Sequence, residues 1–198
     1  MHSKLLVATS NQGKLKEFKS ILGGIIEVVS PAELFFRDID VKEGSDYLEN
    51  ARKKAETYRS QFPGLICGED SGLEIDALDG KPGPLSARYG GEELPHKDKC
   101  SLILKELGNL PIYDRTARFR ATLALLEGDG GGFVAFEGVL EGWIAFEYKG
   151  NEGFGYDPIF IPQGFSRTNA ELGMQIKNRI SHRAKAIRKL AEYLKKTH

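Results

Sequence analysis

The sequence predicts an α/β fold, and two observations about the order of its elements support this. At the N-terminus, the apolar run 5–8 is followed by a polar segment and then by helical spacing of apolar residues, the order strand, loop, helix. Further along, residues 117–125 alternate apolar and polar side chains, as a strand with one polar face does. A chain of 198 residues, 40% of them hydrophobic, can bury one sizeable core. We therefore expect a single domain over residues 1–198.

The overall charge favours no polyanionic partner. Lys and Arg together number 28, as do Asp and Glu, so the formal net charge is zero. The two cysteines, Cys67 and Cys100, have neither metal-ligand spacing nor a disulfide pattern, which agrees with a reducing cytoplasm. No apolar run could span a bilayer, and no signal-peptide pattern is present. The sequence predicts a cytoplasmic protein that binds neither nucleic acid nor a membrane.

The polar segment after the first strand is a candidate phosphate site. It consists of Thr9, Ser10, Asn11, Gln12, Gly13 and Lys14. A helix N-terminus offers free N–H groups and the positive end of the helix dipole, and Lys14 adds a full charge. The alternative is that Thr9, Ser10 or Asn11 merely caps the helix. The segment lacks the glycine pattern of a Walker P-loop.

Two further elements precede the central acidic stretch. Residues 25–29 form a second apolar strand after the helix ends at Gly23-Gly24. Asp46 and Glu49 have the spacing of a capping box and predict the start of a helix. The buried face of that helix is expected to carry Leu48, Ala51, Ala55 and Tyr58. Its polar residues Glu49, Asn50, Lys53 and Lys54 are interpreted as surface groups.

The stretch 67–89 is the candidate catalytic centre, because it carries acids, glycines and an arginine between hydrophobic runs. A strand ending at Cys67 is expected to turn at Gly68, so that Glu69 and Asp70 emerge side by side. Two adjacent carboxylates repel each other, and Mg²⁺ or Mn²⁺ would neutralise them. A solvated turn is the alternative, since Asp, Ser and Gly favour turns.

The chain after this stretch predicts a helix and a group of strands. Cys100, Ile103, Leu104 and Leu107 share one helical face that ends before Gly108. The strand 117–125 is then followed by two shorter runs, 133–136 and 139–146, after the glycines at 128–132. This arrangement predicts an antiparallel meander.

A second candidate site lies near the C-terminus. Residues 153–157, Gly-Phe-Gly-Tyr-Asp, place two aromatic rings and a carboxylate on one loop. A ring can stack on a planar base, and a carboxylate can accept hydrogen bonds from its nitrogens. The alternative is a turn whose aromatic rings cover the core. Ser181 can cap the last helix, which places His182 and Arg183 in a first turn whose dipole opposes their charge.

That conflict at the last helix has two interpretations. An anionic or carbonyl-bearing ligand at this end would relieve it, and Lys177 on the preceding segment would also be in reach. The alternative is a solvated basic helix.

Five motifs follow one another along the chain: TSNQGK at 9–14, ENARKKA at 49–55, EDSGLEIDALDGKPGPLSARY at 69–89, GFGYDPIF at 153–160 and SHR at 181–183. Together they resemble the inosine triphosphatase family of noncanonical purine nucleoside triphosphate pyrophosphatases, nearly end to end. The resemblance implies hydrolysis of ITP, dITP or XTP to the monophosphate and pyrophosphate with Mg²⁺. It also implies a long mixed β-sheet flanked by helices, two lobes with the active-site cleft between them, and a homodimer.

The resemblance also assigns roles to individual residues. The triphosphate is expected to contact Thr9, Ser10, Asn11 and Lys14, within the loop that includes Gln12 and Gly13, and also Lys54. Asp70 matches the family's general base and metal ligand, and Ser71 a nucleotide contact. Phe154, Gly155, Tyr156 and Asp157 match the base-binding loop, with Phe154 stacked on the purine. The residues that favour a 6-oxo over a 6-amino group are Lys177, His182 and Arg183.

The predicted metal ligands are Asp70, Glu69 and Glu43. The sequence around Glu43 departs from the family pattern. Residues 41–44 are Val-Lys-Glu-Gly, where the family has an acidic run, so Glu43 is assigned as a ligand by its position before the glycine. Two other functions remain open at this point. One is a Maf-like pyrophosphatase acting on pyrimidine or modified triphosphates. The other is a nucleic-acid-binding module that uses the basic last helix, against which the zero net charge argues.

Overall fold

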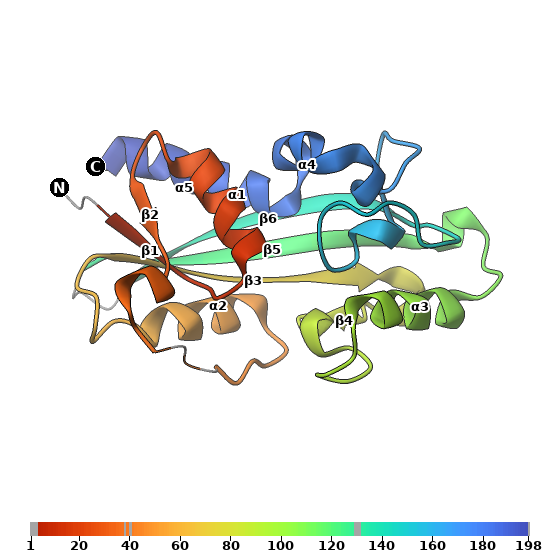
Figure 1. Ribbon diagram of the computed structural model, residues 1–198, viewed down its shortest axis with the longest axis horizontal. Helices are drawn as coiled ribbons and strands as arrows, with labels where there is room; N and C mark the ends of the chain where they lie inside the picture. Colours follow the sequence, from red (N-terminus) through yellow and green to blue (C-terminus); the bar gives the residue numbers. More distant parts are fainter. Residues whose placement is uncertain (1–3, 38, 40, 129–131, 198) are drawn as a thin grey trace. The chain divides into compact units, whose positions relative to one another are not determined.

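Among the described residues, seven strands form one mixed sheet (Figure 1). The computed structural model describes residues 4–197, apart from residues 38, 40 and 129–131. The strands are β1 (Lys4–Ala8), β2 (Glu27–Val29), β3 (Leu65–Ile75), β4 (Pro82–Gly83), β5 (Thr116–Leu126), β6 (Phe133–Ile144) and β7 (Phe160–Pro162). Their order is β2-β1-β3-β5-β6-β7, with β4 paired to β3. β1 is parallel to β2 and β3, whereas the pairs β3–β4 and β6–β7 are antiparallel.

Helices flank this sheet, which confirms the predicted α/β class. They are α1 (Gln12–Leu22), α2 (Tyr47–Glu56), α3 (His96–Leu107), α4 (Asn169–Ile180) and α5 (His182–Thr197). None of the helices in the described part of the chain combines the length and apolarity needed to cross a bilayer.

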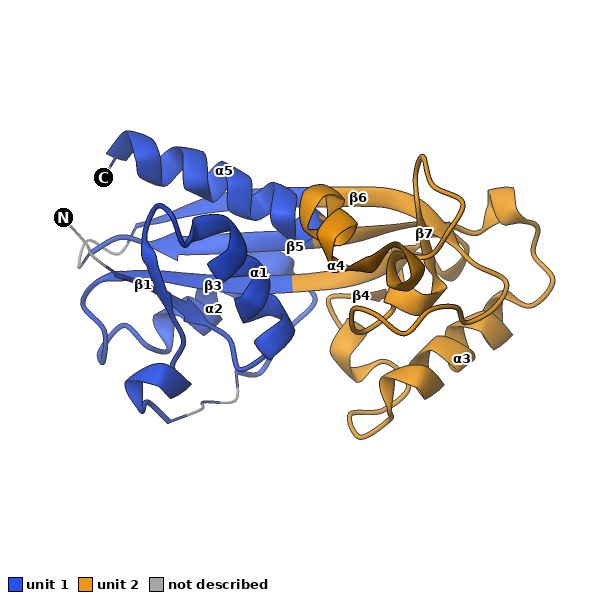
Figure 2. Cartoon of the chain, turned by 45° about the horizontal axis from the view of Figure 1, so that its top comes forward, with its two compact units in different colours: residues 1–70, 121–138, 182–198 blue, residues 71–120, 139–181 orange. Residues whose placement is uncertain are grey.

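The chain divides into two compact units, coloured separately in Figure 2. Unit 1 contains residues 1–70, 121–138 and 182–198, and unit 2 contains residues 71–120 and 139–181. β3, β5 and β6 each contribute residues to both units. A cleft between two lobes stays a prediction.

The core of unit 1 has two parts because side chains alternate along β1. Leu5 and Val7 belong to a buried cluster that also includes residues of α1 and α5. Leu6 and Ala8 belong to a second cluster, which includes residues of α2. α1 and α5 therefore cover one face of the sheet in this unit, and α2 covers the other.

Unit 2 has one apolar sheet face and one charged face. Leu73 and Ile75 are buried in a cluster with residues of α3 and β5. The residues between and after them in sequence are acidic and pair with arginines of β5: Arg120 Nε lies 3.0 Å from Glu74 Oε1, and Arg118 Nη2 lies 2.9 Å from Asp76 Oδ1. This confirms the predicted strand with one polar face for this part of β5.

Two predicted interruptions are wrong. β3 continues through Gly68, where a turn was expected, and β6 joins the runs 133–136 and 139–146, which were expected to be separate strands. A Cβ atom at Gly68 would lie 1.8 Å from the carbonyl oxygen of Ala51 in α2. At Gly138 it would lie 2.0 Å from the carbonyl oxygen of His182 in α5. Both glycines let a helix pack closely on the sheet, and neither makes a turn.

Gly68→Ala is expected to lower the free energy of unfolding by about 1–3 kcal/mol, because the added methyl group must push α2 away from β3. Urea unfolding measures this loss. Gly24→Ala is the matched control, since a Cβ atom there meets nothing within 4 Å. Equal unfolding free energies for the two variants would contradict the close packing of α2.

Candidate active site

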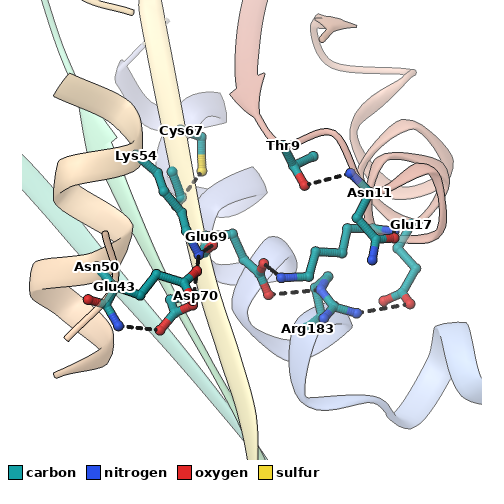
Figure 3. A network of polar contacts seen from close by, with 12 residues as sticks. Thr9, Asn11, Glu17, Glu43, Asn50, Lys54, Cys67, Glu69, Asp70 and Arg183 are labelled. Carbon is teal, nitrogen blue, oxygen red and sulfur yellow. Dashed lines mark hydrogen bonds and ion pairs between the residues drawn. The ribbon is translucent and has the colours of Figure 1, made fainter. Parts of the chain in front are cut away.

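Charged side chains from α1, α2, β3 and α5 meet around the middle of β3 in unit 1 (Figure 3). Glu69 and Asp70 are neighbours within this strand, so their side chains point to opposite faces of the sheet. Figure 3 shows Glu69 directed toward Arg183 and Asp70 toward Asn50. The prediction that the two carboxylates emerge side by side from a turn is therefore wrong.

On the first face, Glu69 lies in a chain of buried ion pairs. Its Oε2 is 2.6 Å from Lys14 Nζ, and its Oε1 is 3.0 Å from Arg183 Nε. Arg183 Nη1 in turn lies 3.1 Å from Glu17 Oε1, and neither Glu17 nor Glu69 exposes its side chain. Burial by itself disfavours the Glu69 carboxylate, but the charges of Lys14 and Arg183 prevail and hold its pKa below the usual range. Burial lowers the pKa of Lys14, although Glu69 acts in the opposite sense.

On the second face, Asp70 is held by two donors from α2. Lys54 Nζ lies 2.8 Å from its Oδ1, and Asn50 donates from Nδ2 to its Oδ2 at 2.9 Å. Lys54 also pairs with the carboxylate of Glu43. Burial raises the pKa of Asp70, although Lys54 acts against it. Burial disfavours the Lys54 ammonium, but Asp70 and Glu43 outweigh this and raise its pKa.

Asn50 also fixes the loop that carries Glu43. Its Oδ1 accepts a hydrogen bond from Gly44 N at 2.7 Å, and its Nδ2 donates to Gly44 O at 3.0 Å. Asn50 is fully buried, which corrects its interpretation as a surface group. One amide thus holds both the loop and Asp70 in place.

The loop before α1 is built around a helix cap. Asn11 Oδ1 accepts from Lys14 N at 3.1 Å, and Thr9 Oγ1 accepts from Asn11 N at 3.2 Å. Asn11 therefore makes the cap that the sequence left open among three residues. Ser10 and Gln12 are exposed, and Gly13 is half-buried. A role of this loop in phosphate binding stays a prediction.

A separate cluster forms in unit 2 around residues 149–157, which we call the aromatic loop. Asp157 Oδ2 accepts from Phe154 N at 2.8 Å and lies 2.5 Å from Lys177 Nζ. The Lys177 ammonium is also 4.0 Å from the centre of the Phe154 ring, a cation–π contact. Gly153 and Gly155 have φ of +82° and +65°, which non-glycine residues rarely adopt.

The two aromatic side chains of this loop have different environments. Tyr156 is buried in the core of unit 2, and its hydroxyl donates to Ser86 O at 2.8 Å. Phe154 is half-buried. The alternative that the aromatic rings cover the core thus applies to Tyr156, whereas Phe154 is not part of that buried core.

The residues predicted to surround the base belong to different units. Lys177 lies in unit 2, with its ammonium buried beside Asp157. His182 and Arg183 begin α5 in unit 1, where both are buried. Arg183 forms hydrogen bonds with Glu17 and Glu69 there. These two carboxylates neutralise the arginine charge that opposes the helix dipole, so the neutralising groups come from the chain itself. Ser71 is half-buried and follows Asp70 in β3.

The sequence analysis missed Glu17 as a member of the unit 1 cluster. Glu17 stands three residues after Lys14, at helical spacing for a shared face. Its neighbour Phe18 is fully buried. An acid placed next to the apolar stripe of α1 is the signal that could have identified it.

The unit 1 cluster offers two carboxylates to a metal ion. Glu43 and Asp70 both contact Lys54, so their oxygens converge on one cation already. Across the described residues, no group of three or more His, Cys, Asp and Glu side chains forms a metal site. Mg²⁺ is commonly bound by one or two carboxylates together with substrate phosphates and water, and this pair fits such an ion.

Comparisons with known proteins find relatives that match nearly the whole chain. The dITP/XTP pyrophosphatase of Bacillus subtilis (strain 168) is 44% identical over 191 residues, 96% of each chain. The protein of that name from Halalkalibacterium halodurans is 44% identical over 190 residues, 96% of this chain and 97% of that one. The Ham1 protein of Staphylococcus aureus has a solved structure with a TM-score of 0.86 and 37% identity, covering 98% of this chain and 100% of that one.

A second solved structure and a family model also match this chain. The HAM1 protein of Coxiella burnetii has a TM-score of 0.88 and 36% identity, covering 98% of this chain and 99% of that one. Residues 5–193 match the model of the Ham1 family. These similarities confirm the resemblance inferred from the five motifs: the chain belongs to the Ham1 family.

Proposed function

We propose that this chain hydrolyses the noncanonical purine nucleoside triphosphates ITP, dITP and XTP to the nucleoside monophosphate and pyrophosphate. The relatives named dITP/XTP pyrophosphatase match nearly its whole length. The observation that carries the proposal is the cluster at the middle of β3. There, lysines from two helices each lie within 3 Å of one of two adjacent acids, Lys14 beside Glu69 and Lys54 beside Asp70.

The two lysines supply the positive charge that a triphosphate needs. Lys14 lies in the first turn of α1, where free backbone N–H groups also favour an anion. Lys54 reaches the opposite face of β3 from α2. In the proposed reaction Lys54, on the same face as Asp70, stabilises the charge that develops on the pyrophosphate leaving group, and Lys14 binds the triphosphate at the start of α1.

Asp70 is the proposed general base. Lys54 and Asn50 each contact one of its two oxygens, so the carboxylate has a fixed orientation. A fixed carboxylate can orient a water molecule and accept its proton as the water attacks phosphorus. Glu69 is the charge partner of Lys14 and Arg183 and is not assigned a place in this step.

A divalent cation would be held by Glu43 and Asp70. We propose Mg²⁺, with Mn²⁺ as the alternative, because oxygen ligands suit both ions. When bound, such an ion polarises phosphate oxygens as a Lewis acid. Glu69, predicted from the sequence as a third ligand, faces the other side of the sheet.

The aromatic loop is the proposed base-binding element. Phe154 offers ring surface for stacking, while Asp157 and Lys177 offer hydrogen-bonding groups next to it. A site that donates to a 6-oxo group meets a second donor when a 6-amino purine enters. The unsatisfied pair costs about 1–3 kcal/mol, a selectivity of about ten- to a hundredfold.

A substrate panel tests this proposal. The protein is incubated with Mg²⁺ and ITP, XTP, GTP, ATP, dTTP or UTP, and released pyrophosphate is measured. Preference for ITP and XTP supports the assignment, whereas preference for a pyrimidine triphosphate would favour a Maf-like activity instead. A homodimer, carried over from the family resemblance, and a cytoplasmic location, expected from the cysteine pattern, are further parts of this proposal.

Phe154→Ala is expected to raise KM for ITP about tenfold with little loss of stability, because stacking of a base on an aromatic ring contributes about 1–3 kcal/mol. Steady-state kinetics and thermal unfolding measure the two effects. Phe165→Ala serves as control, since Phe165 is a partly exposed phenylalanine of the same unit. An unchanged KM with a lowered Tm would mean that Phe154 only packs against the core.

A further inference from the structure

The aromatic loop is attached to α4 at both of its ends. At its start, Thr168 Oγ1 donates to Lys149 O at 2.9 Å, and Thr168 also forms a capping box with Glu171 that fixes the first turn of the helix. Further along, Glu152 Oε2 accepts from Met174 N at 3.1 Å. The loop and α4 therefore hold each other in position. The end of the loop that carries Asp157 is the part proposed to bind the base.

Asn169 makes the attachment at that end. It is the first residue of α4, 2% exposed, and its Nδ2 donates to Asp157 Oδ1 at 3.2 Å. The other carboxylate oxygen of Asp157 accepts from Phe154 N and pairs with Lys177. Asn169 thus fixes the carboxylate from the side opposite to the two groups proposed to meet the base.

We propose that Asn169 is a positioning residue for base binding: by holding Asp157, it sets the positions of Phe154 and Lys177. The inference rests on the proposed function, because it assigns the residue to affinity for the purine. Nothing in the sequence motifs pointed to Asn169, which lies outside all five of them. Asp70 is held by Asn50 and Lys54, not by Asn169, so loss of Asn169 should leave the chemical step unchanged.

An effect of Asn169 on base binding can be distinguished from an effect on the stability of the fold. The Oδ1 of Asn169 is buried without a hydrogen-bond partner among the described residues. Asn169→Ala therefore removes one hydrogen bond and, at the same time, one unsatisfied buried acceptor. The two effects on the free energy of unfolding oppose each other, so the fold should tolerate the change.

The experiment compares Asn169→Ala with the matched control Asn151→Ala, an exposed asparagine of the aromatic loop. Steady-state kinetics with ITP give KM and kcat, and hydrogen–deuterium exchange reports the protection of the Phe154 amide. Asn169→Ala should raise KM about tenfold with kcat within about twofold of wild type, the effect of losing one hydrogen bond to a charged group. The Phe154 amide should exchange faster in this variant only.

Asn169→Asp provides a second variant of the same size. It replaces the donor with a negative charge beside Asp157, so KM should rise at least as much as in Asn169→Ala. Unchanged KM and unchanged Phe154 exchange in both variants would overturn the inference. So would a fall in kcat and Tm with normal Phe154 exchange, because that pattern indicates a general structural role.

Failure of the proposed function would be visible separately. If the wild-type protein does not hydrolyse ITP, the assignment of the substrate is wrong, and the exchange measurement still decides the link from Asn169 to Phe154. Faster exchange of the Phe154 amide in Asn169→Ala then supports the positioning role, and unchanged exchange overturns it.

Discussion

Asp70→Asn is expected to lower kcat for ITP by about 10²–10⁴-fold, the usual contribution of a positioned general base. The amide is nearly the same size but cannot accept a proton from water. Lys54 keeps its contacts with the Glu43 carboxylate and with the carbonyl oxygen of Glu69, so the fold should survive. Kinetics and circular dichroism measure the two outcomes.

The control for this variant is Asp114→Asn, which makes the same change at an exposed position of unit 2. Its kcat should match that of the wild type. Near-normal turnover by Asp70→Asn would remove Asp70 from the role of base. Loss of the circular dichroism signal would instead show that the fold depends on the ion pair between Asp70 and the half-buried Lys54.

Arg183→Met is expected to lower the free energy of unfolding by about 3–5 kcal/mol, the loss typical of a broken buried ion pair. Arg183 lies between Glu17 and Glu69, and all three side chains are at most 2% exposed. Without the guanidinium, Glu17 loses the ion pair it makes with Arg183, and Glu69 keeps only Lys14 of its two cationic neighbours. Urea unfolding measures the loss.

Two comparisons make this result specific. Arg167→Met, at an exposed arginine, should change stability by less than about 0.5 kcal/mol. The double variant Glu17→Gln with Arg183→Met should be more stable than the sum of the single effects predicts, because the two residues are in contact. A loss for Arg183→Met no larger than that of the Arg167 control would contradict the buried network.

Local signals in the sequence predicted many elements of this fold. The apolar run at 5–8 is β1, and the helix predicted at Asp46 is α2, with Asp46 Oδ1 accepting from Glu49 N at 2.7 Å. The helical face from Cys100 to Leu107 is α3. These elements are set by periodicity and caps within a few residues, so the sequence alone was sufficient to place them.

The failures occurred where distant parts of the chain meet. Gly68 was expected to make a turn, but it lacks a side chain because α2 packs closely against β3 at this point. No local sequence pattern reveals this contact. α4 was not predicted, and its non-helical Gly173, with φ of +81°, interrupts the apolar period. Glu69 is 114 residues from Arg183 in sequence, so their pairing could not be read from spacing.

The candidate site shows the same division. Motifs identified Asp70, Lys14 and Lys54, which the structure gathers around β3. They did not show that Glu69 and Asp70 face opposite sides of the sheet, although the alternation of a continuous strand requires it. The error came from expecting a turn at Gly68, and it changed the proposed metal ligands.

Separate quantification of the products formed from ITP is the most direct test of the proposed reaction. The purified protein is incubated with ITP and Mg²⁺, and IMP, IDP, pyrophosphate and orthophosphate are each measured, with Asp70→Asn assayed in parallel to exclude a contaminating hydrolase. We predict equal amounts of IMP and pyrophosphate from the wild-type protein and almost none from the variant. IDP with orthophosphate, or products that Asp70→Asn forms equally fast, would contradict the account.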